Sequence, residues 1–275
     1  MSAFRELEGK TAVVTGGASG MGKGIARQLI ARGMHVVIAD IEKDALYASA
    51  AELGAQAVLT DVSDLASVRA LAAEVCRRFG TVHVVCNNAG IGPFARIADL
   101  TIEDWRWMLD VNLWGVIHGI SVFLPILRGN AHGGHIVNTA SVGGLVTMPG
   151  LGAYAVTKHA VVALSETLAQ ELEQEQSRVG VTVLCPGPTR TNIKASSRNR
   201  PPARGTGGLT DVDLEKSEFG ASARWLSPDD VGRIVVAAIV RGDLYAFTHP
   251  EQLGVVEQRF KRILEAGRAA ALEAP

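Results

Sequence analysis

A tyrosine and a lysine four residues apart carry the clearest chemical signal in the sequence. If their segment is helical, Tyr154 and Lys158 share one face of the helix. A free tyrosine hydroxyl, with a pKa of ~10, is a poor base at neutral pH, and a neighbouring ammonium group lowers that pKa. Ser141 lies at the expected end of a strand and could hold a substrate oxygen. Because this spacing is also common on protein surfaces, it predicts acid–base chemistry only beside a cofactor site.

A glycine-rich turn near the N-terminus predicts that cofactor site. Residues 15–22 follow a short apolar run and precede a helical pattern. Glycines let the backbone approach a pyrophosphate closely, and the N–H groups at the start of the next helix can bind its phosphates. We expect cofactor contacts from Gly16, Ser19, Gly20, Met21 and Gly22.

The choice of cofactor follows from an acidic residue at the end of the next apolar run. Asp40 lies about 20 residues beyond the glycines, as in dinucleotide-binding folds. Its carboxylate can accept hydrogen bonds from both ribose hydroxyls of NAD and would repel the 2′-phosphate of NADP. Because Ile41, rather than Arg or Lys, follows it, the predicted cofactor is NAD. Further contacts are expected after two later strands, from Asp61, Val62, Asn88, Ala89 and Gly90.

Alternating apolar runs and helical patterns predict the elements that position these residues. The runs are nearly continuously apolar, which is typical of strands covered on both faces. Their alternation with helices predicts an α/β fold with a doubly wound, Rossmann-type parallel sheet of about seven strands in a single domain, 1–275. The expected strands are 11–15, 35–40, 56–61, 82–87, 135–139, 181–185 and 244–248, and the expected helices include 21–32, 65–79, 160–176 and 253–264.

One segment, 188–227, lacks a clear period and is predicted to be an irregular lid over the substrate. It contains a basic group of residues, namely Arg190, Lys194, Arg198, Arg200 and Arg204. These could bind an acidic substrate group or carrier, although a solvated, mobile loop is the favoured alternative. A regular helix is expected to resume at Pro228, with Ser227 as its cap.

Composition limits the classes of partner. Hydrophobic residues make up 47% of the chain, charged residues 20%, and the net charge is −1. This balance predicts a substantial core and no affinity for nucleic acid. No apolar run reaches the ~18 residues of a membrane span, so no membrane association is expected. Three scattered cysteines fit a reducing, cytoplasmic location.

Two other groups of residues are interpreted as structural. His132 and His135 lie three apart in a glycine-rich stretch, but no third ligand follows at a sensible spacing. We therefore expect a turn with solvated histidines and no metal. Cys86 is interpreted as a small buried residue and not as a nucleophile.

The combined pattern resembles the short-chain dehydrogenase/reductase family, in its compact, NAD-preferring branch of ~250 residues. The matches include the glycine-rich turn, Asp61, the Asn-Asn-Ala-Gly sequence at 87–90, Ser141 and the Tyr-x-x-x-Lys motif. The resemblance implies that Tyr154 is the general acid/base, that Lys158 lowers its pKa and that Ser141 polarises the substrate. It also implies a water relay anchored by Asn112, nicotinamide contacts from Pro186, Gly187, Thr189 and Thr191, and a homotetramer or homodimer.

The expected reaction is therefore NAD(H)-dependent interconversion of a small-molecule secondary alcohol and a ketone. Apolar residues around the site favour a bulky hydrophobic or aromatic substrate, namely Ile91, Phe94, Val142, Leu145, Val146, Met148 and Leu151. The alternative is a 3-oxoacyl-carrier ketoreductase. A non-catalytic nucleotide sensor is less favoured because the Ser–Tyr–Lys set is complete. An extended-branch epimerase is also less favoured because only about 80 residues follow Pro186.

Overall fold

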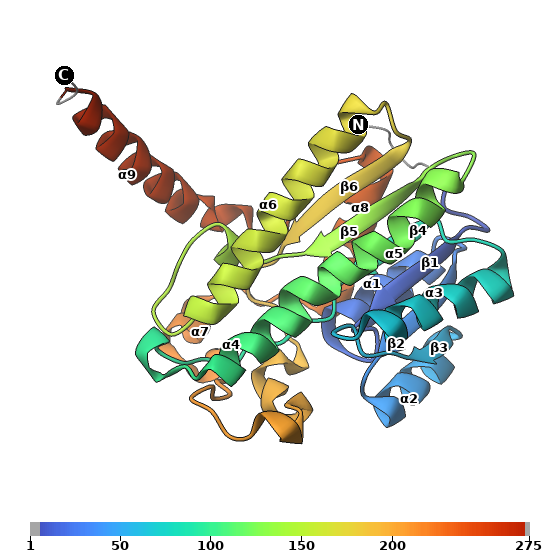
Figure 1. Ribbon diagram of the computed structural model, residues 1–275, viewed down its shortest axis with the longest axis horizontal. Helices are drawn as coiled ribbons and strands as arrows, with labels where there is room; N and C mark the ends of the chain where they lie inside the picture. The colour runs from blue at the N-terminus through green and yellow to red at the C-terminus, as the bar shows by residue number, and fades with distance from the viewer. Residues whose placement is uncertain (1–5, 273–275) are drawn as a thin grey trace.

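The computed structural model describes residues 6–272, and in that range one parallel sheet organises the fold. Its strand order is β3-β2-β1-β4-β5-β6-β7, which is the doubly wound arrangement (Figure 1). The strands are β1 (Thr11–Thr15), β2 (His35–Asp40), β3 (Gln56–Leu59), β4 (Val84–Asn87), β5 (Gly134–Thr139), β6 (Val179–Cys185) and β7 (Tyr245–Phe247). From β1 the chain adds β2 and β3 on one side and β4 to β7 on the other, so the direction of strand addition reverses at β1. In such sheets the ligand site lies at the carboxyl ends of the strands beside this reversal.

Helices cover both faces of the sheet (Figure 1). One layer contains α1 (Gly20–Ile30), α2 (Lys43–Leu53) and α8 (Pro228–Arg241), and its core includes Ile25, Leu46 and Val235. The other contains α3 (Leu65–Phe79), α5 (Gly115–Gly129) and α6 (Gly152–Gln174), with Leu71, Phe123 and Leu168 in its core. Since apolar side chains meet the sheet from both sides, the central strands are buried throughout, as their continuous apolar runs predicted.

The helix α4 (Ile102–Leu109) continues into α5 through a widened π turn, Asp110–Trp114. The combined helix, Ile102–Gly129, has a mean hydropathy of 1.4 in its most apolar window and is long enough to cross a membrane by length and composition alone. A helix in a protein core passes the same test; Trp107 and Phe123 are fully buried here, and 28% of the window as a whole is buried. No such span was predicted from the sequence, because the apolar runs in this region are short. In the structure they form one continuous helix.

The segment predicted to be an irregular lid contains short pieces of helix. These are the 3₁₀ turns Asn192–Asn199, Pro202–Arg204 and Leu214–Lys216, followed by α7 (Glu218–Ser222). The Ser227 hydroxyl then accepts a hydrogen bond from Asp230 N at the start of α8, which is the cap that the sequence predicted. The last helix, α9 (Leu253–Leu272), extends away from the body (Figure 1).

Several boundaries differ from the sequence prediction. The helix expected at 160–176 begins at Gly152, so it includes both Tyr154 and Lys158. The helix expected at 253–264 continues to Leu272, and α2 was not predicted. The ends of the predicted domain, 1–5 and 273–275, lie outside the described residues.

Candidate functional site

The glycine-rich turn after β1 is held against the end of β4. The Thr15 hydroxyl accepts hydrogen bonds from the backbone N–H groups of Asn88 (3.0 Å) and Ala89 (3.1 Å). The Asn88 side chain in turn donates to the carbonyl of Thr15 at 2.9 Å. These bonds join the two strand ends that form the floor of a cavity, and the same loops carry the residues predicted to bind the cofactor.

The turn has the shape that a bound pyrophosphate needs. Gly16 and Gly20 have positive φ angles of 65° and 51°, a conformation that favours glycine. A Cβ on Gly16 would lie 2.8 Å from Ala89 Cα, and one on Gly20 would lie 3.0 Å from the Thr191 side chain. The backbone of the turn thus packs closely against Ala89 and Thr191, as its glycines led us to expect. Together with the start of α1, which directs its N–H groups toward the cavity edge, this arrangement fits a dinucleotide.

Most of the predicted cofactor residues lie around this one cavity. Its lining includes Gly16, Ser19, Gly20, Met21, Asp40, Ile41, Asp61, Val62, Asn88, Ala89, Gly90, Tyr154, Lys158 and Thr191. Pro186, Gly187 and Thr189 line the adjoining cavity, described below. Gly22 lines neither; a Cβ there would lie 2.1 Å from the Gly16 carbonyl, so this glycine serves the packing of the turn itself.

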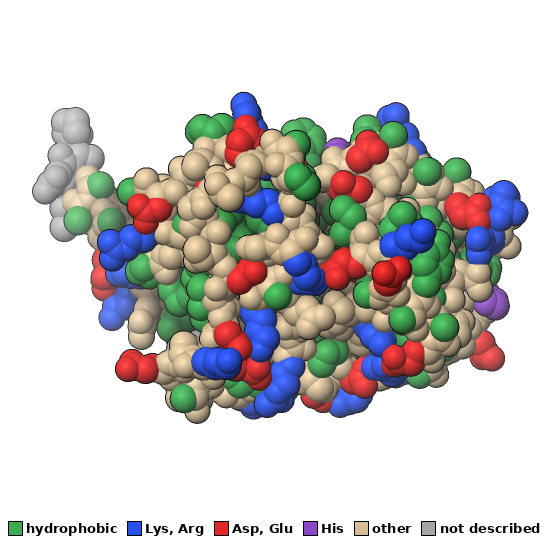
Figure 2. All heavy atoms as spheres, turned by 90° about the horizontal axis from the view of Figure 1, so that it is seen from below, with side chains coloured by type: hydrophobic (Ala, Val, Ile, Leu, Met, Phe, Trp, Pro, Cys, Tyr) green, Lys and Arg blue, Asp and Glu red, His purple; other side chains and the backbone are tan. Residues whose placement is uncertain are grey.

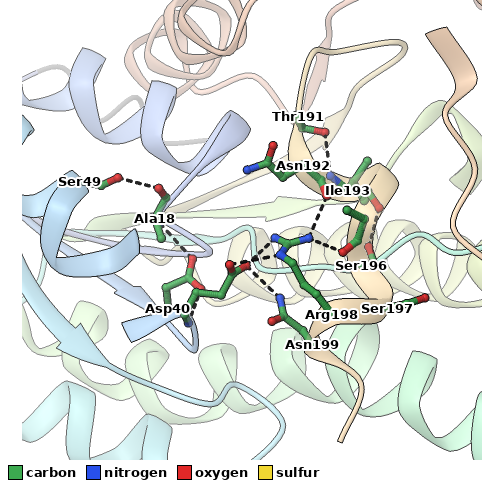
Figure 3. Close-up of polar contacts among 12 residues, drawn as sticks. Ala18, Asp40, Ser49, Thr191, Asn192, Ile193, Ser196, Ser197, Arg198 and Asn199 are labelled. Atoms are coloured by element: carbon green, nitrogen blue, oxygen red, sulfur yellow. Dashed lines mark hydrogen bonds and ion pairs between the residues drawn. The ribbon is translucent and has the colours of Figure 1, made fainter. Parts of the chain in front are cut away.

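The carboxylate of Asp40 is oriented by the backbone (Figure 3). Its Oδ2 accepts from Ala18 N at 3.0 Å, and its Oδ1 accepts from Glu42 N at 3.1 Å. Burial raises the pKa of Asp40, and the backbone hydrogen bonds from Glu42 and Ala18 partly offset this. One oxygen of Asp61 accepts from the N–H and hydroxyl of Ser63. Both acids are therefore fixed at strand ends.

A feature that the sequence did not predict spans this cavity. The guanidinium of Arg198 donates to the carboxylate of Glu42 at 2.5 and 3.2 Å, and Asn199 donates to the same carboxylate at 3.0 Å (Figure 3). The Arg198 hydrogen bond lowers the pKa of Glu42. The buried hydroxyl of Ser196 accepts from Gly92 N at 3.1 Å, which attaches the same segment to the loop after β4. We call Glu42, Arg198 and Asn199 the clasp.

Tyr154, Lys158 and Ser141 converge where the two cavities meet. Tyr154 and Lys158 project from the first two turns of α6, and the Lys158 ammonium lies 5.6 Å from the centre of the Tyr154 ring. It donates to the carbonyl of Thr139 at 2.8 Å. Ser141 follows β5, and its hydroxyl oxygen is oriented by a hydrogen bond from Gly143 N at 3.0 Å. Of these three, Tyr154 lines both cavities.

Burial shifts both titratable groups toward their neutral forms. It raises the pKa of Tyr154 above its ordinary value, and a hydrogen bond with Ser141 offsets this in part. It lowers the pKa of Lys158 to about 8. The net shift is upward because removal of the phenolate from water costs more than the Ser141 hydrogen bond returns. The lowering of the Tyr154 pKa by Lys158 stays a prediction. At neutral pH the Tyr154 hydroxyl carries its proton.

Asn112 lies in the π turn, fully buried, and it holds the loop after β4. Its side chain accepts from Ile91 N at 2.8 Å and donates to Ile91 O at 2.9 Å. A Cβ on Gly90 would lie 3.2 Å from Asn112 Oδ1 and 3.5 Å from Lys158 Nζ, so both groups lie beside this glycine. The extra backbone of the π turn is what brings Asn112 to this position. A water relay through it stays a prediction.

The second cavity has a volume of about 720 Å³, and Ser141 and Tyr154 are among its lining residues. We call it the substrate cavity. It includes the residues expected around the nicotinamide, so it has room for that ring and a substrate together. Five of the predicted apolar residues line it: Phe94, Val142, Val146, Met148 and Leu151. Leu145 instead packs in a core cluster, and Ile91 lines the cofactor cavity. Trp225 and Val255, which the sequence analysis did not select, complete its apolar wall.

The five basic residues of the 188–227 segment all pair with acids of the protein itself, although Arg190 and Lys194 remain exposed to solvent. Arg200 pairs with the fully buried Asp104 at 2.6 Å, and Arg204 pairs with Glu103 at 3.1 Å. Arg190 pairs with Glu215, and Lys194 with Asp213. On the face where this segment lies, Figure 2 shows acidic and basic side chains interspersed. Arg200 and Arg204 therefore attach the segment to α4, whereas Arg190 and Lys194 pair with acids of the segment itself.

A second correction concerns His135. It lies within β5, fully buried, with Nε2 2.8 Å from the Thr182 hydroxyl, so the prediction of a solvated turn was wrong. Burial lowers its pKa to about 4, which keeps the ring neutral. Cys86 is buried in β4, and burial raises the pKa of its thiol to about 12, as expected of an inert residue. Within residues 6–272, no group of three or more His, Cys, Asp or Glu side chains is placed so that it could bind a metal ion.

Comparison with known proteins identifies the family of the chain. Residues 10–202 match the short chain dehydrogenase family. A C alpha-dehydrogenase of Sphingobium sp. strain SYK-6 is 30% identical over 96% of this chain and 88% of its own. A 1-deoxy-11-beta-hydroxypentalenate dehydrogenase of Streptomyces exfoliatus is 38% identical over 76% of this chain and 77% of its own.

Among solved structures, a short chain dehydrogenase/reductase from Burkholderia phymatum, determined in complex with NAD, superimposes with a TM-score of 0.87. It is 38% identical and covers 95% of this chain and 96% of its own. The chain therefore belongs to the short-chain dehydrogenase/reductase family. It is an oxidoreductase with the Rossmann-type fold that its strand order displays.

Proposed function

We propose that this enzyme is an NAD(H)-dependent dehydrogenase that interconverts a bulky apolar secondary alcohol and its ketone. The observation that carries the proposal is the position of Tyr154, whose side chain lines both the dinucleotide cavity and the apolar cavity. A single hydroxyl at that junction can exchange a proton with a substrate held beside the nicotinamide. The hydroxypentalenate dehydrogenase and the C alpha-dehydrogenase, both named as dehydrogenases, support the reaction class.

The choice of NAD rests on the charge around Asp40. Its oriented carboxylate lies in the dinucleotide cavity, with Glu42 beside it, and Arg198, the neighbouring cation, is already paired with Glu42. A 2′-phosphate at this position would meet two acids, whereas a ribose diol can donate to Asp40. The complex of the Burkholderia phymatum relative with NAD supports the same choice.

The catalytic roles that we propose follow from the protonation states. Tyr154, protonated at neutral pH, gives its proton to the ketone oxygen in reduction, and its deprotonated form accepts the alcohol proton in oxidation. Ser141 holds that same oxygen, because Gly143 N fixes its hydroxyl. Lys158 contributes positive charge below its pKa of about 8. NAD, when bound, accepts hydride from the carbinol carbon, and NADH returns it.

Two further properties remain part of this proposal. We propose a homotetramer or homodimer formed through α5 and α6, because Trp114 beside α5 and Val156 on α6 leave apolar surface exposed. We also propose a cytoplasmic location, based on the free, buried Cys86 and Cys185. Small-angle scattering would measure the assembly, and a monomer at micromolar concentration would contradict it.

The deciding experiment follows NAD reduction by absorbance across secondary alcohols graded from small aliphatic to bulky aryl and polycyclic. We expect turnover with the bulky apolar members, a preference for NAD over NADP, and no turnover in Tyr154→Phe. Retained activity in the variant would exclude Tyr154 as the acid/base. Measurable NAD binding with no turnover of any alcohol or ketone would instead support the nucleotide-sensing alternative.

A further inference from the structure

The first turns of α9 form one wall of the substrate cavity, and this wall is polar. Its lining residues on α9 are Val255, Gln258, Arg259 and Arg262, at helical spacings of three, four and seven. These spacings place them on a single stripe that faces the cavity. The neighbouring stripe, with Val256, Phe260 and Leu264, faces a separate groove on the outer side of the helix. The α9 wall of the cavity therefore carries two guanidinium groups.

These two arginines differ from the other charged residues of the cavity. Lys194 and Arg190 are paired with Asp213 and Glu215, at 2.9 and 3.3 Å. Glu251 is paired with Arg224, at 2.9 Å. In contrast, Arg259 and Arg262 form no ion pair with an acid anywhere in residues 6–272. The acids that line the cavity are thus already neutralised, and its unneutralised charge is positive.

Nothing in the packing of α9 accounts for the pair. Arg259 lies over the ring of its neighbour Phe260, 5.7 Å from the centre, which orients the guanidinium without neutralising it. Three residues apart on one stripe, Arg259 and Arg262 repel each other, which destabilises an isolated helix slightly. An anion between them would remove this repulsion. Gln258, on the same stripe, adds an amide donor beside the pair.

We propose that Arg259 and Arg262 form an anion subsite that binds a carboxylate of the substrate, far from the carbon that reacts at Tyr154. This inference rests on the proposed function and names its substrate class as apolar hydroxy or keto carboxylic acids. The substrate would place its oxygen at Ser141 and Tyr154, its apolar body against Val146, Met148 and Trp225, and its carboxylate on α9. A guanidinium binds a carboxylate through two parallel hydrogen bonds, so this end fixes the orientation.

The chemistry at the carbinol carbon is unchanged by this subsite. Oxidation breaks the C–H bond, whose hydride goes to NAD, and the O–H bond, whose proton goes to Tyr154; the carboxylate neither gains nor loses a bond. Its binding energy is available equally in the ground and transition states. The subsite is therefore expected to lower KM for the acid and leave kcat nearly unchanged.

The test compares three matched substrates that share one apolar skeleton and one secondary hydroxyl. One ends in a carboxylate, the second in a primary amide, and the third in a methyl group. A homologous series of hydroxy alkanoates, in which the distance between the hydroxyl and the carboxylate increases, first identifies the chain length with the highest kcat/KM. For the wild-type enzyme we expect kcat/KM for the acid to exceed that for the amide by about ten-fold or more, since hydrogen bonds to charged groups are strong. Added salt should reduce this ratio.

Variants then assign the preference to α9. Arg259→Gln and Arg262→Gln should each raise KM for the acid several-fold, the double variant more, while kinetics with the amide stay unchanged. Arg268→Gln is the matched control, because Arg268 is an exposed arginine of the same helix that lines the outer groove. It should leave both substrates unaffected.

The outcomes separate this inference from the proposed function. If the methyl-terminated alcohol and the amide are oxidised as efficiently as the acid, the dehydrogenase assignment stands and the anion subsite is wrong. The subsite is also wrong if the glutamine variants lose activity with all three substrates in equal proportion, because α9 then has only a structural role. If none of the three is oxidised, although NAD binds, the proposed function itself fails.

Discussion

Arg198 binds the carboxylate of Glu42 across the opening of the dinucleotide cavity, although the two residues are 156 positions apart in the chain. Glu42 follows the strand that ends in Asp40, and Arg198 is the last residue but one of the 3₁₀ turn Asn192–Asn199. The same turn is attached on its other side through Ser196 to Gly92 N. Because all three residues of the clasp line this cavity, we expect the clasp to slow the exchange of a bound nucleotide.

Glu42→Gln is expected to speed NAD release. Both side chains of the pair are partly exposed, about a third for Arg198, so the free-energy contribution is that of a surface pair. Such a pair contributes about 0.2–1 kcal/mol, which corresponds to a change of roughly 1.4- to five-fold in the release rate. Stopped-flow fluorescence of bound NADH measures it. Glu52→Gln, which breaks exposed pairs with Lys23 and Arg27 on the back of α1, is the control and should leave release unchanged.

Asp40→Ser should reverse or abolish the preference between the two nucleotides. The variant loses the acceptor for the ribose diol and the repulsion of a 2′-phosphate, so the NAD dissociation constant should rise about ten-fold or more. Affinity for NADP should improve at the same time. Isothermal titration with both nucleotides measures the two constants. An unchanged NAD:NADP ratio would show that Asp40 only orders the turn, through its bonds to Ala18 N and Glu42 N.

The fold was predictable because its signals are local and repeated. Each central strand is a short apolar run, and α3 has the predicted bounds, Leu65–Phe79, because Asp64 caps it and Gly80 ends it. The helix α2 was missed because alanine and serine occupy five of its eleven positions and it lacks a clear apolar stripe. The start of α6 was placed too late for a related reason, since small residues there bury against the body without marking a period.

The site was predictable where its residues follow strand ends, and not where its partners come from distant segments. Asp40 and Ser141 each end or follow a strand, so the parallel sheet brings them to one edge. The partners of the basic segment could not be inferred, because in the sequence Glu42 and Asp104 carry no feature that distinguishes them from the other acids. His135 was expected in solvent because it follows two glycines at the start of a strand. In the structure it lies within β5, where both faces of the sheet are covered.

The rate of alcohol oxidation should rise with pH and depend on Tyr154. Burial raises the pKa of this hydroxyl, so its deprotonated form is scarce at pH 7 and increases up to ten-fold for each pH unit. Ketone reduction uses the protonated form and should be nearly flat between pH 6 and about 8. Tyr154→Phe should lower both rates by about 10²–10⁴-fold, the usual contribution of a general acid/base. A rising oxidation profile that persists in the variant would assign the titration to another group.

His135→Gln tests the correction made for β5 through the pH dependence of stability. The pKa of His135 is about 4 in the folded protein, against 6.5 for the ordinary side chain. Because the unfolded chain binds the proton more tightly, the wild type loses stability as pH falls from about 6.5 to about 4, and nothing is lost above pH 7. A full shift of this size amounts to about 3 kcal/mol.

Glutamine keeps a polar partner for the Thr182 hydroxyl and does not titrate, so the variant should lack this acid-dependent loss. We therefore expect the free energy of unfolding of His135→Gln to be lower than that of the wild type at pH 7.5, by the ordinary cost of a core substitution. The difference in free energy of unfolding between the wild type and the variant should shrink, and can change sign, as pH falls below 6. Urea unfolding followed by circular dichroism at several pH values measures both quantities. A gap independent of pH between 4 and 7.5 would mean that His135 reaches solvent and titrates normally, as the sequence alone had indicated.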